Sequence, residues 1–170
     1  MTIFDRSIPR LRQLDDIFGG RTNNCYSTDA AIAELLPTTD LVIGAVLLPG
    51  AAAPKLIRKE HLAVMSAGSV LCDVAIDQGG CFETSKATSH TNPTYMVDNI
   101  LHYCVANMPG AAPMTSSYAL NNVTLPFTVA LANEGLSALE RLPHLKAGLN
   151  VQGGKLAHPE VIEALKGQVA

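Results

Sequence analysis

Four segments of the sequence place acidic, small or polar residues directly after apolar runs that are typical of buried strands. These segments are Phe4–Ser7, Ala45–Gly50, Asp73–Gly80 and Val105–Pro109. In an open parallel sheet, ligands bind in the crevice outside the carboxyl ends of the strands. A single flat ligand lying along that edge would contact all four segments, and a dinucleotide has this shape.

Asp5 carries the sharpest chemical prediction because it ends the short apolar run Met1–Asp5. A carboxylate at the end of the second strand of a dinucleotide fold accepts hydrogen bonds from ribose hydroxyls. Such an acid favours NAD over NADP, because it repels a 2′-phosphate. A charged hydrogen bond of this kind contributes about 1.5–3 kcal/mol. The alternative is that Asp5 is a solvated acid in a surface turn.

Asp77 is the second candidate for chemistry. It follows the apolar run Ser69–Val74 and precedes Gly79 and Gly80, a setting in which backbone approaches a carboxylate closely. We expect partial burial of Asp77 and a role in handling a proton or a water molecule. The alternative is a turn acid that accepts hydrogen bonds from local amides.

The glycine-rich turn that would bind a pyrophosphate is not found before Asp5. A G-x-G-x-x-G turn normally precedes such an acid by about 20 residues, whereas only four residues precede Asp5. Gly19 and Gly20 follow the acid and end a predicted helix, so they do not replace that turn. The sequence therefore indicates either a different fold or a dinucleotide fold without its first strand–helix unit.

Strands and helices alternate up to about residue 113. Strands are predicted at Met1–Asp5, Asn24–Tyr26, Asp40–Val46, Ser69–Val74 and His102–Ala106, and helices at Pro9–Phe18, Asp29–Leu36 and from Pro54 to about Met65. The run Asp40–Val46 has the pattern of a buried strand. This alternation is typical of an α/β fold with a doubly wound parallel sheet, here an incomplete Rossmann-like one.

After Pro113 the pattern becomes helical and no strand is predicted. The expected helices are Thr115–Asn133, Ser137–Leu142 and Pro159–Leu165. Pro126 is expected to interrupt and kink the first of them. We therefore expect a partial NAD-binding domain at residues 1–113 and an all-helical C-terminal segment at residues 114–170.

Composition and charge argue against several classes of protein. Hydrophobic residues make up 48% of the chain and charged residues 16%, with a net charge of −3 and no long run of lysine or arginine. A nucleic-acid partner is therefore not expected. The longest apolar stretch, Leu41–Leu48, is shorter than the ~18 residues of a membrane span, and the N-terminus lacks a signal-peptide pattern. We expect no membrane association and a cytoplasmic location.

Cysteines and histidines do not form a recognisable constellation. The four cysteines include no C-x-x-C pair, and the five histidines lack metal-ligand spacing. Neither a metal site nor a disulfide framework is therefore expected. His102 lies in a predicted strand, and we expect it to be a hydrogen-bonded core residue and not a catalyst.

Six longer stretches carry motifs that are more specific than any single signature. They are Leu11–Arg21, Asp40–Leu56, Ala75–Ser85, His102–Gly110, Tyr118–Pro126 and Gly148–Asn150. In this order they closely resemble bacterial alanine dehydrogenases, of the alanine dehydrogenase/pyridine nucleotide transhydrogenase family. The resemblance implies a homo-oligomeric oxidoreductase that uses NAD to convert L-alanine into pyruvate and ammonium.

The resemblance also implies roles for individual residues. Asp77 corresponds to an active-site aspartate, and Asp5 to the acid that binds the adenosine ribose. The other implied cofactor contacts are Arg10 and Ser27 near the adenine, Val46 and Leu47 in a lining loop, Lys86 as a basic contact, and Val74, Ala75, Ile76, Val105, Ala106, Asn107 and Met108 near the nicotinamide.

The chain also departs from the family pattern. We expect the family's N-terminal substrate domain to be absent from this chain, and with it the catalytic histidine and the lysine and arginine that bind the substrate carboxylate in the family. Ala130 stands where some members build a metal site, and alanine cannot ligate a metal. We therefore expect a truncated, C-terminal portion that is inactive alone. Two alternatives are the NAD-binding part of a proton-translocating transhydrogenase and a non-catalytic module that binds nucleotide or co-assembles with full-length subunits.

Overall fold

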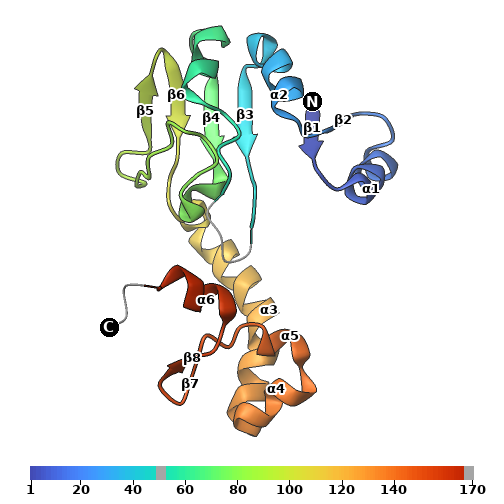
Figure 1. Cartoon of the computed structure of the whole chain (residues 1–170), viewed down its shortest axis with the longest axis vertical. Coiled ribbons are helices and arrows are strands. Elements are labelled where there is room, and N and C mark those ends of the chain that lie inside the picture. The colour runs from blue at the N-terminus through green and yellow to red at the C-terminus, as the bar shows by residue number, and fades with distance from the viewer. Residues whose placement is uncertain (49–52, 167–170) are drawn as a thin grey trace. The chain divides into compact units, whose positions relative to one another are not determined.

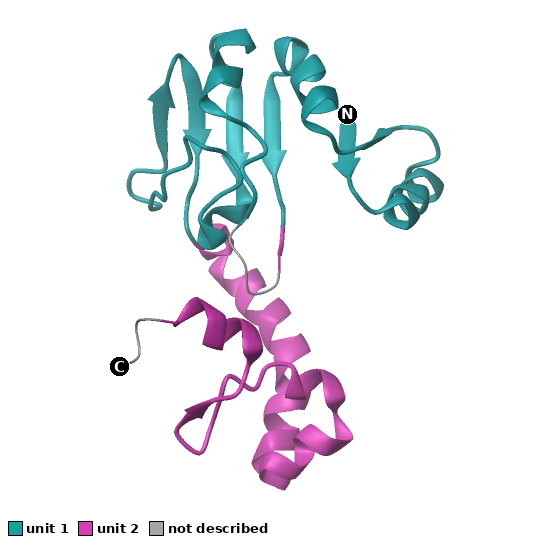
Figure 2. Ribbon diagram, in the orientation of Figure 1, with its two compact units in different colours: residues 1–46, 53–106 teal, residues 47–52, 107–170 magenta. Residues whose placement is uncertain are grey.

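The computed structural model describes residues 1–48 and 53–166, which form two compact units (Figure 1 and Figure 2). The first unit comprises residues 1–46 and 53–106, and the second comprises residues 47–52 and 107–170. The first unit contains the mostly parallel strands that the sequence predicts, and the second unit is mainly helical.

The first unit begins with a small parallel sheet and two helices. Its elements are β1 (Thr2–Asp5), α1 (Ile8–Phe18), β2 (Asn23–Tyr26) and α2 (Asp29–Leu35). Local signals set these boundaries: Ser7 caps α1 through its side-chain oxygen, and Gly19 ends it in a left-handed conformation with φ 56°. Thr28 caps α2 in the same way as Ser7 caps α1. The four predicted elements are confirmed to within one residue at each end.

The second sheet of this unit has the strand order β3-β4-β6-β5 (Figure 1). Its strands are β3 (Leu41–Gly44), β4 (Val70–Asp73), β5 (Thr94–Val97) and β6 (Ile100–Tyr103). β3, β4 and β6 are parallel, as predicted, whereas β5 is an antiparallel edge strand that was not predicted. Asp98 and Asn99 form the turn between β5 and β6 with φ values of 49° and 64°, which is typical of a tight hairpin.

The connection between β3 and β4 shows that one predicted helix is wrong. Residues 53–58 are not helical and contain an isolated parallel bridge from Ile57 to Phe82; the 3-10 helix η2 (Lys59–Val64) follows. The backbone of this segment instead pairs with the loop after β4. The Leu56 amide donates to the Cys81 carbonyl at 2.7 Å, and the Glu83 amide donates to the Ile57 carbonyl at 2.7 Å. These long-range bonds use backbone groups that a helix would have paired locally.

The core of the first unit lies against one face of the second sheet. Its buried members are Ile32, Leu36, Ala53, Ile57, Leu62, Met65, Leu71, Ala75, Cys81, Phe82 and Ile100. Phe4 of β1 and Val42 of β3 pack against this cluster, so both strands border the same core. Leu41 and Ile43, which alternate with Val42 and point to the opposite face, are 53% and 61% exposed. β3 is therefore buried on one face only, which corrects the prediction of a buried strand.

The second unit is dominated by α3 (Pro113–Glu134), which continues past Pro126, so the proline does not interrupt it. It also contains the short helices α4 (Ala138–Arg141), α5 (Pro143–Lys146) and α6 (Pro159–Ala164). The helical tail is confirmed, except that β7 (Val151–Gln152) and β8 (Lys155–Leu156) form a small hairpin there. Gly153 and Gly154 make its turn with positive φ.

Among the helices of the described residues, none combines the length and the apolar character that a membrane span needs.

Candidate functional site

The carboxylate of Asp73, the last residue of β4, organises the loop that follows this strand. The residue is completely buried. Oδ1 accepts a hydrogen bond from the Ala75 amide at 3.1 Å, and Oδ2 accepts from the amides of Cys81 at 2.9 Å and Phe82 at 3.3 Å. The Ser85 hydroxyl also donates to Oδ2. A buried carboxylate needs such donors to offset its lost hydration, so these bonds fix the loop around it.

Gly80 allows the backbone to approach this carboxylate closely. Its φ is 74°, and a Cβ atom there would lie 2.7 Å from Asp73 Oδ2 and 2.7 Å from the Ser85 Cβ. The neighbouring Cys81 is not a reactive group, because burial, with the adjacent Asp73 charge, raises the pKa of its thiol to about 12. The uncharged thiol is a poor nucleophile and a poor metal ligand at neutral pH.

Lys55 holds the same loop from a distant part of the sequence. Its Nζ donates hydrogen bonds to the carbonyls of Gly79 at 2.6 Å and Gly80 at 2.7 Å. Asp73 and Lys55 therefore anchor both ends of the 3-10 helix η3 (Val74–Gln78). This turn contains the Asp77 that the sequence predicts as a functional residue.

The side chains of η3 divide between the core and the surface. Ala75 and Ile76 are buried, whereas Val74 and Asp77 are exposed. The expected partial burial of Asp77 is therefore wrong, because η3 turns its side chain outward. A ligand at the carboxyl end of β4 would meet the Val74 and Asp77 side chains and only the backbone of the other two residues.

His102 lies at the centre of a buried hydrogen-bond network, which confirms its prediction as a satisfied core histidine. Its Nδ1 is 3.0 Å from the Ile100 carbonyl, which can only accept, so Nδ1 carries the proton. Nε2 then accepts from the Thr84 hydroxyl at 2.7 Å. The Tyr95 ring stacks on His102 with centroids 4.9 Å apart, and the Tyr95 hydroxyl accepts from the Lys86 amide at 2.7 Å. The Lys86 backbone is thus fixed while its side chain is exposed.

Asp5 and Ser27 lie side by side at the carboxyl ends of β1 and β2. The Ser27 amide donates to the Asp5 carbonyl at 3.0 Å. The half-buried Asp5 carboxylate also accepts from the Ser7 amide at 2.7 Å through Oδ1. It therefore has the local turn contact of the alternative interpretation as well as the strand-end position of a ribose acid. Arg10 lies on the first turn of α1, where its guanidinium donates to Gln13 Oε1 at 3.1 Å.

The remaining candidate residues divide between the two units. Val46, Val105 and Ala106 belong to the first unit, and Leu47, Asn107 and Met108 belong to the second. Val46 packs against the core and Val105 is buried, whereas Ala106 and Leu47 are exposed. Asn107 adopts a left-handed conformation with φ 57°, and Met108 is half-buried. Within the expected strand-end segment at residues 45–50, positions 49 and 50 lie outside the described residues.

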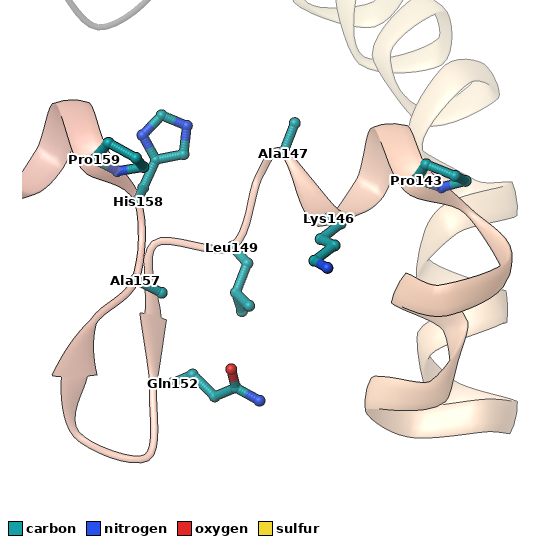
Figure 3. Close-up of a pocket in the computed structure, with 8 residues that line it drawn as sticks. All are labelled: Pro143, Lys146, Ala147, Leu149, Gln152, Ala157, His158 and Pro159. Atoms are coloured by element: carbon teal, nitrogen blue, oxygen red, sulfur yellow. The ribbon is translucent and has the colours of Figure 1, made fainter.

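The second unit has a pocket whose lining includes none of these candidate residues (Figure 3). Its lining consists of Pro143, Lys146, Ala147, Leu149, Gln152, Ala157, His158 and Pro159. Its titratable members are Lys146 and His158, and it contains no carboxylate, so it lacks the acids on which the predicted chemistry depends.

Asp73, Lys55, Ser85 and Tyr95 are structural members of the site that were not predicted as such. The sequence contains a pattern that could have identified Asp73, because an acid that ends an apolar strand before a Gly-Gly loop can accept hydrogen bonds from the amides of that loop. No sequence pattern identifies Lys55, because its hydrogen-bond partners are 24 and 25 residues away in the sequence. Among the described residues, no group of three or more histidine, cysteine or acidic side chains could hold a metal ion.

Both sheets of the first unit contain parallel strands; Asp5 ends β1, and the anchored turn η3 follows β4. This arrangement defines an α/β domain of the Rossmann-like type. The family model described as "Alanine dehydrogenase/PNT, C-terminal domain" matches residues 1–159. The chain belongs to this alanine dehydrogenase/pyridine nucleotide transhydrogenase family, which confirms the resemblance seen in the sequence.

Similar proteins agree with this assignment. The chain is 59% identical over 165 residues to an alanine dehydrogenase of Halomonas elongata, covering 96% of this chain and 44% of the relative. It is 48% identical to alanine dehydrogenase 2 of Staphylococcus aureus, covering 98% of this chain and 45% of the relative. A solved L-alanine dehydrogenase superposes with a TM-score of 0.86 at 50% identity, covering 98% of this chain and 46% of that one. The chain therefore spans less than half the length of these relatives.

A solved transhydrogenase from Sinorhizobium meliloti is a weaker match. It has a TM-score of 0.66 at 26% identity, covering 93% of this chain and 42% of that one. The Rossmann-like fold class is thus confirmed, and alanine dehydrogenases are the more similar branch.

Proposed function

We propose that this chain supplies one wall of the NAD site of an alanine dehydrogenase. The complete enzyme converts L-alanine, NAD and water into pyruvate, ammonium, NADH and a proton, and bound NAD accepts the hydride. The observation that carries this proposal is the anchored turn η3, which exposes Asp77 at the carboxyl end of a parallel strand. Open α/β sheets bind their ligands at this position. The similarity to alanine dehydrogenases supports the choice of reaction.

The residue types at the strand ends fit a dinucleotide. Asp5 would accept hydrogen bonds from the adenosine ribose, and Ser27 and Arg10 would border the adenine end. Asp77 would face the nicotinamide and the substrate, where it would hold or move a proton. The proposed lining is completed by Val46, Leu47, Val74, Ala75, Ile76, Lys86, Val105, Ala106, Asn107 and Met108. The anchored backbone of η3 would orient the nicotinamide ring against the substrate Cα.

The two regions then have different roles in the complete enzyme. Residues 1–113 form part of the NAD-binding domain, and residues 114–170 return to the substrate domain. α3 supports this division, because its apolar side chains Tyr118, Leu120 and Val123 are exposed and need cover from the rest of the enzyme or from other subunits of a homo-oligomer. All four cysteines are free thiols, which supports a reducing, cytoplasmic compartment.

The NAD-binding part of a transhydrogenase is the second candidate. It shares the fold, but the lower identity of the transhydrogenase, 26% against 50%, favours the dehydrogenase.

We expect the purified chain alone to form no NADH from L-alanine, because it supplies only one wall of the proposed cleft. The assay follows NADH absorbance at saturating alanine and NAD. Alanine-dependent turnover by the pure chain would refute this expectation.

The ribose role of Asp5 is tested by titrating NADH fluorescence. We expect weak binding by the chain, and Asp5→Ala should weaken it by about 10-fold or more, since a charged hydrogen bond contributes about 1.5–3 kcal/mol. Asp16→Ala is the matched control, because it removes the same charge from an exposed position on α1. Equal affinities of the two variants, or no NADH binding by the unmodified chain, would contradict the assignment.

A further inference from the structure

Lys86 lies on a segment that crosses the carboxyl ends of two neighbouring parallel strands, β4 and β6. At one end of this segment, the Ser85 hydroxyl donates to the carboxylate of Asp73, the last residue of β4. At the other end, the Thr88 amide donates at 2.9 Å to the carbonyl of Cys104, which directly follows β6. Open α/β sheets bind their ligands outside the carboxyl ends of the strands. The segment therefore lies on the edge where the proposed dinucleotide binds.

The side chain of Lys86 is free although its backbone is held. It is exposed and forms no ion pair within the part of the chain that the structure describes. The Lys86 amide, in contrast, donates to the Tyr95 hydroxyl at 2.7 Å. A lysine that is only a solvated surface residue needs no such fixed backbone. A lysine that binds an anion gains from it, because less conformational freedom is lost when the ligand binds.

The Tyr95 hydroxyl bridges the backbone on both sides of Ser85. It accepts a hydrogen bond from the Lys86 amide and donates one to the Thr84 carbonyl at 2.9 Å. Burial raises the pKa of Tyr95, so the hydroxyl keeps the proton that it donates. One oxygen atom thus fixes both peptide groups that flank Ser85, and with them the position from which the Lys86 side chain extends.

Tyr95 is itself held by His102, its partner across the β5–β6 hairpin. The two rings stack with their centroids 4.9 Å apart. His102 is completely buried, and its Nε2 accepts from the Thr84 hydroxyl at 2.7 Å. The edge strand β5 (Figure 1) therefore brings a phenol with a fixed orientation to the segment that carries Lys86.

We propose that Tyr95 is a positioning residue for Lys86, whose ammonium group binds the pyrophosphate of the dinucleotide. This inference rests on the proposed function, because that function supplies the dinucleotide. The negative charges of NADH lie on its pyrophosphate, and hydrogen bonds from an ammonium group to phosphate oxygens are charge-assisted. Tyr95 does not contact the cofactor and acts through the backbone of residues 84–86.

The first test is a double-mutant cycle on NADH affinity, measured by fluorescence titration. Lys86→Ala should weaken binding about fivefold or more, because a charged hydrogen bond is lost. Tyr95→Phe should weaken binding by the unmodified chain about threefold, and should have no effect when residue 86 is alanine, because it acts only through this lysine. A general structural role predicts the same loss in both backgrounds, and that result would overturn the proposal.

Amide hydrogen exchange tests the bridge without a ligand. Tyr95→Phe removes the hydroxyl but keeps the ring that stacks on His102, so the chain should still fold. We expect the Lys86 amide to exchange at least about tenfold faster in this variant. Tyr118→Phe is the matched control, because it makes the same change at a side chain of α3 that is 65% exposed. Equal exchange of the Lys86 amide in the two variants would overturn the proposal, and circular dichroism verifies that both are folded.

The readouts separate this proposal from the proposed function. NADH binding that depends on Asp5 but not on Lys86 would overturn the positioning role and leave the proposed function standing. A chain that binds no NADH would overturn both. Faster exchange at Lys86, together with the expected dependence of the Tyr95→Phe effect on Lys86, would support both.

Discussion

Replacement of Asp73 by asparagine is the most direct test of how the η3 turn is held. The carboxylate accepts hydrogen bonds from the amides of Ala75, Cys81 and Phe82 and from the Ser85 hydroxyl. An asparagine has one acceptor oxygen and one NH₂ group. If the oxygen keeps the contacts of Oδ2, the NH₂ group faces the Ala75 amide, which is itself a donor.

Asp73→Asn therefore loses one charged hydrogen bond, leaves one buried donor unpaired and weakens the remaining bonds by removing the charge. Each of these three losses costs about 1–3 kcal/mol, so we expect the free energy of unfolding to fall by at least about 3 kcal/mol. That is a large part of the stability of an ordinary domain, about 5–15 kcal/mol.

The assay is urea unfolding followed by circular dichroism, with the midpoint and slope fitted for each variant. Asp98→Asn is the control, because it makes the same chemical change at an exposed residue with φ 49°, a conformation that asparagine tolerates well. An Asp73→Asn midpoint within error of that of Asp98→Asn would refute the role of Asp73 as the anchor of the loop.

Two further predictions concern the same loop. Gly80→Ala should destabilise by about 2–4 kcal/mol, because strain from positive φ adds to the close contact with Asp73. Gly79→Ala, with φ 85° but no atom within 4 Å, should cost only about 1–2 kcal/mol in the same unfolding assay; equal costs would contradict the contact. Iodoacetamide should spare Cys81 at neutral pH in the folded chain and label it after unfolding, because its pKa is raised to about 12. Labelling of Cys81 at the rate of the half-buried Cys25 would contradict its burial.

The elements that the sequence predicted best are those with local signals. α1 is bounded by the Ser7 cap and by Gly19, and α2 by the Thr28 cap, so neighbouring residues suffice to locate them. The β5–β6 hairpin was missed although Asp98 and Asn99 mark its turn, because the short run before them lacks a strong apolar alternation. The helix predicted after β3 is wrong for the opposite reason. The local sequence pattern favours a helix there, but the backbone forms hydrogen bonds with the loop at Cys81 instead.

The candidate site was predicted in outline from residue types at strand ends. Asp5 and Asp77 were located in this way, but their roles stay predictions until binding is measured. Lys55 and Tyr95 could not be found, because each acts through bonds to backbone that is remote in the sequence.

The sequence by itself determined the family, the alternation of strands and helices, and the acids that end β1 and follow β4. Only the tertiary structure decided that Asp73 is the buried anchor while Asp77 is exposed, and that none of the described strands pairs with the second edge of β1 or of β3. The physical reason is that local propensity and side-chain pattern act over a few residues. Burial and strand pairing depend instead on backbone groups tens of residues apart. Leaving such a group buried and unpaired costs more free energy than local helix or strand propensity contributes.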